Sequence, residues 1–315
     1  MKIIDMHCDT MLESYRKKKN LYDLEGHINI EKLKKGGSFV QCFALFIPQH
    51  KEAEECNIDL APYPLYHELV KTFKQNMAEC SADIKQVFCT KDILENDRLS
   101  ALLTVEDGTF VEGKYERIDE MYNDGARMLA LTWNYENCFG YPNNIDAKLH
   151  AKGLKDFGKD AIRYMNEKGI IVDVSHLSEG GFWDVVANSK ETHIPFVASH
   201  SCCRDICSHQ RNLTDKQLKA LADCGSIAGV NFYSAFLEND GKVSRVSDIV
   251  KHLEHMKNVC GVSAIAFGSD FDGIDCEVEY KDFVGFNLIE EAMTKVFTDD
   301  EIDKISHENF LRIFG

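Results

Sequence analysis

Eight short apolar runs recur along the 315-residue chain, most of them ending in a polar or charged residue. Their hydrophobicity is mostly continuous rather than alternating, which is typical of strands that are buried on both faces of a parallel sheet. The predicted strands are 3–9, 39–47, 101–106, 127–133, 170–176, 195–200, 226–233 and 264–270. Because parallel strands need long crossover connections, this pattern requires helices between the strands.

The stretches between the runs have helical spacing. Apolar residues from Leu154 to Met165 step by three and four, Thr214 begins a capping-box sequence, and a third helix near Leu253 ends at Gly261. Eight strands that alternate with helices predict an α/β fold, the (β/α)8 TIM barrel. A doubly wound open sheet is the alternative, but that fold usually carries a glycine-rich phosphate loop after its first strand, and none is found here.

The segment between the second and third predicted strands, residues 47–101, is too long for an ordinary connection. It includes a helical stretch near residues 66–77. We therefore expect extra helices or a lid over the barrel mouth after strand 2, and we interpret residues 1–315 as a single hydrolase barrel domain.

Composition and charge exclude several classes of partner. The chain has 36 basic and 52 acidic residues, a net charge of −16, which argues against nucleic acid and anionic membranes. No apolar run approaches the ~20 residues of a membrane span, and no signal peptide is evident. The 12 cysteines are scattered through apolar strands and helix ends, so we expect reduced thiols in a cytoplasmic protein.

Residues able to bind metal lie at the carboxyl ends of five of the predicted strands. They are His7, Asp9, Glu106, His176, His200 and Asp270. The carboxyl ends of all strands in a barrel meet at one mouth, so these residues are expected to converge. Three imidazoles with several carboxylates suit a pair of divalent ions, zinc above all, and a carboxylate such as Glu106 can bridge two ions.

Each of these residues also has a structural interpretation. His176 or His200 alone could be a hydrogen-bonded rim histidine, and Glu106 or Asp270 alone could cap a helix or be solvated. The number of strand ends that carry such residues favours metal binding. The remaining histidines, His209 among them, lie in predicted loops and helices, and we interpret them as surface or structural residues.

Seven short motifs resemble those of one known family. They are Asp5-Met6-His7-Cys8-Asp9-Thr10, Val105-Glu106-Asp107-Gly108, Asp173-Val174-Ser175-His176, Ser199-His200-Ser201, Arg211-Asn212, Val230-Asn231-Phe232-Tyr233 and Gly268-Ser269-Asp270-Phe271-Asp272-Gly273. In order and approximate spacing they resemble the membrane (renal) dipeptidase family of the amidohydrolase superfamily, almost from end to end. The resemblance implies a microbial-type cytosolic enzyme that hydrolyses dipeptides with two Zn²⁺ per chain, and it leaves open a homodimer.

The resemblance also implies a role for each metal-binding residue. His7 and Asp9 would bind one zinc ion, His176 and His200 would bind the other, and Glu106 would bridge them. A hydroxide bridging the two ions would then attack the peptide carbonyl.

The same family pattern implies contacts with the substrate. Asp270 would be the catalytic acid–base group, close to the attacking hydroxide and also to the substrate. Arg211 would hold the terminal carboxylate of the dipeptide, a task that suits a guanidinium fork. Tyr233 would be a further substrate contact.

Two positions depart from the family pattern. A substrate-contacting histidine that often follows the fourth strand is replaced here by Trp133 and Asn134, whose N–H groups could substitute only in part. A tyrosine that contacts the substrate carboxylate appears as Phe236, so more of the carboxylate binding would fall to Arg211. Both changes concern substrate preference rather than reaction class.

Two other functions remain alternatives. Another amidohydrolase activity, such as a deaminase or lactonase, is one, although deaminases more typically open with His-x-His and use one metal ion. A non-catalytic metal-binding barrel is the other, although such a protein would be expected to have lost at least one ligand. Tolerance for a D-residue at the carboxyl end of the dipeptide is not readable from these residues.

Overall fold

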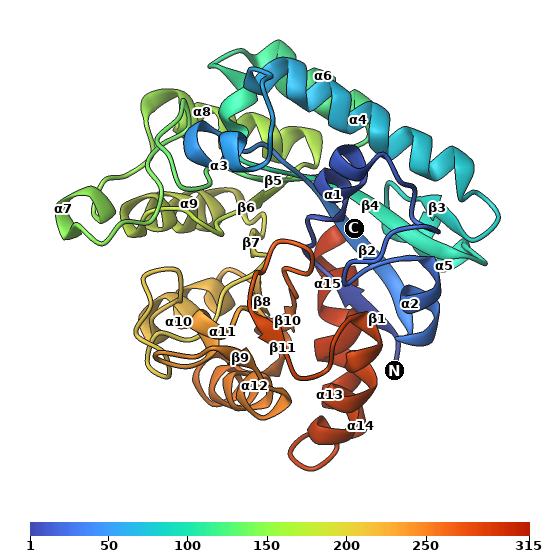
Figure 1. The fold of residues 1–315 in the computed structure, drawn as a ribbon. Helices are drawn as coiled ribbons and strands as arrows, with labels where there is room; N and C mark the ends of the chain where they lie inside the picture. Colours follow the sequence, from blue (N-terminus) through green and yellow to red (C-terminus); the bar gives the residue numbers. More distant parts are fainter.

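Eight parallel strands form a closed barrel with helices around it in the computed structural model, which describes residues 1–315 (Figure 1). The barrel strands are β1 (Ile3–Asp5), β2 (Ser38–Phe46), β4 (Leu99–Glu106), β5 (Met128–Ala130), β6 (Ile171–Asp173), β7 (Val197–Ala198), β8 (Ile227–Val230) and β10 (Ile265–Phe267). Each pairs with the next in parallel, and β10 pairs with β1 to close the ring. The predicted (β/α)8 barrel is confirmed, and the open sheet is wrong.

Two apolar layers hold the barrel. A cluster of 13 buried residues includes at least one side chain from every barrel strand, such as Ile4, Leu102 and Ile227, and forms the interior. A second cluster of 72 buried residues packs the strands against the surrounding helices. Because the strands have an apolar layer on both sides, their sequences are continuously apolar rather than alternating.

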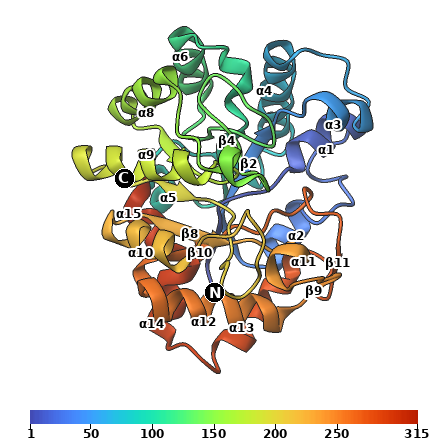
Figure 2. The ribbon, with the colours of Figure 1, turned by 90° about the vertical axis from the view of Figure 1, so that its left-hand side faces the viewer.

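Helices surround the strands in both views, with α4, α6 and α8 on one side and α12, α13 and α14 on the other (Figures 1 and 2). The helices are α1 (Thr10–Lys17), α2 (Ile30–Lys35), α3 (His50–Glu55), α4 (Pro62–Glu79), α5 (Thr90–Glu95), α6 (Tyr115–Asp124), α7 (Ala147–His150), α8 (Asp156–Lys168), α9 (Glu179–Thr192), α10 (Asp215–Asp223), α11 (Ser234–Leu237), α12 (Val246–Cys260), α13 (Phe286–Met293), α14 (Asp299–Asp303) and α15 (Asn309–Phe314). Three short 3-10 turns, η1 (Gly108–Val111), η2 (Val262–Ala264) and η3 (Phe283–Gly285), and one π turn, η4 (Lys304–Glu308), complete them. None of the helices has the length and apolar character needed to cross a bilayer.

The three helices expected from apolar spacing are confirmed as α8, α10 and α12. The capping box of α10 is formed as predicted: the Gln217 backbone N–H donates to Thr214 Oγ1, and the Thr214 N–H donates to Gln217 Oε1 at 3.0 Å. All 12 cysteines are free thiols, in agreement with the expectation of a reduced chain.

The long segment after β2 supplies the extra helices that its length predicted. It forms α3, α4 and α5 together with a strand that was not predicted, β3 (Ile84–Gln86), which pairs with the first residues of β4. The short helix α3 packs on the loop after β5, where Tyr135 Oη donates to Glu52 at 2.8 Å. A further two-stranded sheet, of β9 (Val243–Ser244) and β11 (Glu277–Val278), lies outside the barrel.

Several barrel strands end earlier than predicted, and the functional residues begin where the strands stop. β1 ends at Asp5 rather than residue 9, and β10 ends at Phe267 rather than residue 270. His176 and Asp270 have left-handed backbones, with φ of 65° and 63°, which no strand can contain. Except for Glu106, which ends β4, the predicted metal-binding residues therefore lie in loops at the barrel mouth, and strained backbone such as that of His176 and Asp270 is common at functional sites.

Candidate active site

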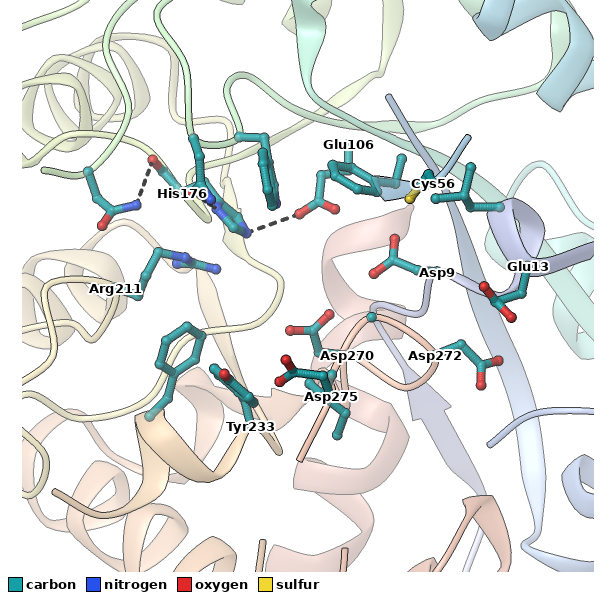
Figure 3. Close-up of a pocket in the computed structure, with 18 of the residues that line it drawn as sticks. Asp9, Glu13, Cys56, Glu106, His176, Arg211, Tyr233, Asp270, Asp272 and Asp275 are labelled. Atoms are coloured by element: carbon teal, nitrogen blue, oxygen red, sulfur yellow. Dashed lines mark hydrogen bonds and ion pairs between the residues drawn. The ribbon is translucent and has the colours of Figure 1, made fainter. Parts of the chain in front are cut away.

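A cavity of about 490 Å³ opens at the carboxyl ends of the barrel strands (Figure 3). Each of the eight barrel strands, or the loop that follows it, contributes to its lining. The cavity is therefore where a TIM barrel places its chemistry. His7 and His200 lie beneath it and are almost fully buried, at 2% and 0% exposure.

Glu106, the last residue of β4, lies between two groups of histidines. Its Oε2 is 3.6 Å from His7 Nε2, whereas its Oε1 is 3.1 Å from His176 Nε2 and 3.4 Å from His200 Nε2. Each oxygen of one carboxylate thus faces a different set of imidazoles. This is the arrangement that a bridging ligand requires.

The residues after β1 and β10 form the other side of the cluster. His7 Nε2 lies 3.7 Å from Asp9 Oδ2 and 3.9 Å from Asp270 Oδ1. Gly273 packs so closely here that a Cβ at this position would collide with the carboxylates of Asp9 and Asp270. The turn after β10 therefore needs glycine in order to bring Asp270 up to His7 and Asp9.

Hydrogen bonds fix which nitrogen of His176 and His200 faces the cluster. His176 Nδ1 lies 3.3 Å from Asn134 Oδ1, an atom that only accepts, so Nδ1 carries the proton. His200 Nδ1 lies 2.8 Å from Ser199 Oγ, whose hydrogen is donated to Asp173, so this Nδ1 also carries the proton. With protons on both Nδ1 atoms, the two Nε2 lone pairs face each other at 3.0 Å. A cation between them explains this contact, because two lone pairs cannot form a hydrogen bond.

Burial shifts the charge state of the cluster. It raises the pKa of Glu106 to about 8 and the pKa of Asp270 to about 7, and the nearby Asp9 adds to both shifts. Burial lowers the pKa of His176 and His200 well below the usual value, which keeps both imidazoles neutral. Burial opposes the charged form of His7 as well, but the carboxylates of Glu106 and Asp9 outweigh it and raise the pKa of His7 well above the usual value. The buried carboxylates therefore call for a positive charge beside them, which His7 supplies in the metal-free cluster and a divalent ion would supply in the loaded one.

The donor set fits divalent metal ions. His7 Nε2 and Asp9 Oδ1 are buried and have no hydrogen-bond partner. Two groups of three residues, His7 with Glu106 and His200, and His7 with Asp9 and Asp270, each bring their ligand atoms within 4.8 Å of one another. Imidazole nitrogens and carboxylate oxygens are the ligands of zinc at catalytic sites.

Arg211 forms one end of the cavity and points into it (Figure 3). Its Nη2 donates to the His200 carbonyl at 3.3 Å, and its guanidinium lies 5.4 Å from the centre of the Phe236 ring. Its Nε is buried and has no partner. Burial lowers the pKa of Arg211, but an arginine stays charged in proteins, so this end of the cavity presents a cation with a free donor.

A family model for the membrane dipeptidases, peptidase family M19, matches residues 1–315. The chain belongs to this family. A protein of Klebsiella pneumoniae, described as an uncharacterized protein in the pqqA 5' region, is 32% identical to this chain over 267 residues. The match covers 80% of this chain and 96% of that protein.

Solved structures of similar fold span the whole chain. The metallopeptidase dipeptidase AC of family M19 covers 100% of this chain and 98% of its own, with a TM-score of 0.87 and 22% identity. A metallopeptidase from Rhodobacter sphaeroides, bound to a phosphinate mimic of L-Ala-D-Ala, has the same coverage and identity and a TM-score of 0.88. The probable dipeptidase PvdM from Pseudomonas aeruginosa covers 97% of each chain, with a TM-score of 0.82 and 17% identity. These likenesses show that the fold of the family is shared.

Every site residue predicted from the sequence lies at this one cavity or directly beneath it. The predicted substrate contacts all line it: Trp133, Asn134, Arg211, Tyr233, Phe236 and Asp270. Asn134 also has a contact that the sequence did not reveal, because its side-chain oxygen accepts a hydrogen bond from His176 Nδ1. Cys8 packs in the apolar layer outside the barrel, as expected.

Some residues at the site were missed. His209, interpreted as a surface or structural residue, is half-buried and lines the cavity. Its Nδ1 accepts from the Arg211 N–H at 3.2 Å, and its ring centre lies 4.6 Å from that of Phe236. The sequence feature that could have identified His209 as a site residue is its position two residues before Arg211. Asp107 was also missed: this buried carboxylate accepts from Gln49 Nε2 at 2.7 Å and from Asn137 Nδ2 at 2.8 Å, and so joins the loops after β2, β4 and β5.

Proposed function

We propose that this member of the membrane dipeptidase family hydrolyses the peptide bond of dipeptides and uses two Zn²⁺ per chain. The observation that carries the proposal is Glu106, whose two oxygens face different histidines at 3.1–3.6 Å. A carboxylate in this position is what two metal ions about 3.5–4 Å apart require.

The ligands divide into two sets around Glu106. His7 and Asp9 would hold one zinc ion, and His176 and His200 would hold the other. The bound ions would supply an activated water at neutral pH and polarise the scissile carbonyl. The sequence alternatives are less well supported, because the cluster has His7-x-Asp9 rather than His-x-His and lacks none of the expected ligands.

Asp270 is the proposed acid–base group. It lines the cavity beside the ligand cluster, and Asn231 Nδ2 donates to its Oδ2 at 2.8 Å, which leaves Oδ1 free to face the reacting atoms. Asp270 would take the proton of the attacking water and pass it to the leaving amine nitrogen.

Arg211 would hold the terminal carboxylate of the dipeptide. Replacing Arg211 with lysine keeps the charge but removes the fork of parallel donors. A hydrogen bond to a charged group contributes about 1.5–3 kcal/mol, so we expect kcat/KM to fall about 10- to 150-fold, mostly through KM.

Steady-state kinetics on a dipeptide and on its carboxyl-terminal amide would measure this effect. The Arg211→Lys variant should lose the preference for the free carboxylate. Arg16→Lys, at the opposite end of the same cavity, is the matched control and should keep that preference. An unchanged preference in Arg211→Lys would place carboxylate binding elsewhere.

The proposal includes tolerance for a D-residue at the carboxyl end of the dipeptide. The Rhodobacter sphaeroides structure of similar fold holds a mimic of L-Ala-D-Ala, which supports this substrate class. Stereochemical preference would be decided by the cavity end around Arg211, where Phe236 offers no hydroxyl.

The deciding experiment combines a metal count with a small panel of substrates. We expect two zinc ions per purified chain, hydrolysis of L-L and L-D dipeptides, and loss of both zinc and activity after dialysis against a chelator, with recovery on adding Zn²⁺. Two zinc ions without dipeptide cleavage would favour another amidohydrolase activity. A protein without zinc that cleaves dipeptides would refute the metal assignment.

A further inference from the structure

A buried carboxylate, Asp173, lies behind the histidines at the end of β6. Its Oδ1 accepts the backbone N–H groups of Ser175 and Ser199, both at 2.9 Å, and its Oδ2 accepts the Ser199 hydroxyl. Asp173 is 1% exposed and Ser199 is fully buried. Asp173 lines no part of the cavity, so it does not touch substrate.

Ser199 connects this carboxylate to His200. Its Oγ lies 2.8 Å from His200 Nδ1, and its only hydrogen is committed to Asp173, because a carboxylate can only accept. His200 Nδ1 must therefore donate to Ser199 Oγ. That leaves the lone pair of His200 on Nε2, which faces Glu106 at 3.4 Å.

We propose that Asp173 is a positioning residue that acts through Ser199 to hold His200 in the tautomer that can bind metal. The inference deepens the proposed function, because it rests on His200 being a zinc ligand. A hydrogen-bond acceptor for the ring nitrogen that does not face the metal fixes the ring orientation and raises the basicity of a metal-binding histidine.

A second buried Asp–Ser pair resembles that of Asp173 and Ser199 but has no histidine nitrogen beside its serine. Asp5, at the end of β1, accepts the Ser269 N–H at 2.7 Å and the Ser269 hydroxyl at 2.6 Å, and both residues are fully buried. Ser269 Oγ contacts no imidazole nitrogen; its further contacts are backbone groups, the His7 carbonyl at 3.3 Å and the Phe271 N–H, which donates to it at 3.2 Å. Asp5 therefore serves as a control for the loss of a buried Asp–Ser interaction.

The substitution Asp173→Asn keeps the shape of the side chain but reverses the direction of the hydrogen bonds that run from residue 173 through Ser199 to His200, which we call the relay. The amide oxygen can still accept the two backbone N–H groups, whereas the amide nitrogen replaces Oδ2 and donates to Ser199 Oγ. The Ser199 hydroxyl is then released to donate to His200 Nδ1 at 2.8 Å, the nearer of its two remaining partners, the other being Ser175 Oγ at 3.2 Å. Donation to His200 moves the imidazole proton to Nε2 and so weakens metal binding there. In Asp5→Asn the same reversal reaches no imidazole nitrogen, because the released Ser269 hydroxyl faces the His7 carbonyl instead.

The test measures zinc affinity and the position of the imidazole proton. Zinc-loaded protein is titrated with a chelator of known affinity, and ¹⁵N NMR of the zinc-free chain reports which nitrogen of His200 carries the proton. We expect Asp173→Asn to weaken binding of one zinc ion about 10- to 100-fold and to move the proton from Nδ1 to Nε2. Asp5→Asn should change neither.

Several outcomes would overturn the relay. They are an unchanged zinc affinity in Asp173→Asn, an equal loss in Asp5→Asn, or a proton on Nε2 in the wild type. A wild-type chain that binds no zinc would instead refute the proposed function, and the NMR measurement would still decide the relay. If Asp173→Asn does not fold, Ser199→Ala with Ser269→Ala as its control removes the same link.

Discussion

Replacing Glu106 with glutamine is expected to give a folded protein that has lost its metal ions and its activity. Glutamine has the same shape, but it is neutral, and only one of its two terminal atoms can accept. The amide nitrogen would face either His7 Nε2 at the Oε2 position or His176 Nε2 at the Oε1 position. A side chain of this kind cannot bridge two cations.

The expected loss is large because the bridging ligand serves both ions. Each metal ion contributes several kcal/mol to catalysis, so we expect kcat/KM to fall by at least about 10³-fold. Elemental analysis should find fewer than two zinc ions per chain. Glu112→Gln, at an exposed carboxylate beyond the turn η1, is the matched control and should keep both zinc and activity.

Stability separates this effect from misfolding. Burial raises the pKa of Glu106 to about 8, which means that the site opposes a negative charge unless a cation balances it. In the metal-free state the neutral glutamine should therefore be at least as stable as the wild type in thermal unfolding. A Glu106→Gln variant with two zinc ions would refute the bridging role.

The barrel could be predicted because strands buried on both faces leave a clear sequence pattern. The candidate ligands could be predicted because the carboxyl ends of parallel strands meet at one mouth, so that Glu106 and His200 converge from distant positions. Strand β3 could not be predicted, because three residues paired at the edge of β4 have no pattern of their own.

The supporting hydrogen bonds of the site were also beyond the sequence. The contact of Asn134 with His176 and that of Asp173 with Ser199 join residues at or beyond the ends of different strands, 42 and 26 residues apart in the chain. Such contacts depend on loop conformation, such as the left-handed backbone of His176, rather than on residue pattern. The sequence therefore predicted which residues converge at the barrel mouth, but not what orients them.

Replacing Asp270 with asparagine is expected to remove turnover and to leave the metal centre intact. Asparagine suits this position because it tolerates the left-handed backbone, with φ of 63°, better than most residues. Its side-chain oxygen can still accept from Asn231 Nδ2, as Asp270 Oδ2 does at 2.8 Å. The proposed ligand sets do not include Asp270, so two zinc ions should remain bound.

The kinetic effect should fall on kcat. An asparagine cannot carry a proton from the attacking water to the leaving amine, and general acid–base catalysis contributes about 10²- to 10⁴-fold. KM should change little, because the proposed carboxylate contact, Arg211 at the end of the cavity, is unaltered in this variant. Asp275→Asn, an exposed carboxylate that lines the same cavity, is the control for the loss of negative charge and should keep most of the activity.

The two variants together distinguish a ligand from a proton carrier. Glu106→Gln should lose zinc and activity together, whereas Asp270→Asn should lose activity at full zinc content. Wild-type kcat in Asp270→Asn would exclude it as the acid–base group, and loss of zinc would make it a ligand, which its distance of 3.9 Å from His7 Nε2 allows as the alternative. Because Asp270 faces His7 and Asp9 while Asn231 holds its other oxygen, we expect neither of these outcomes: the metal centre should remain in place without its proton carrier.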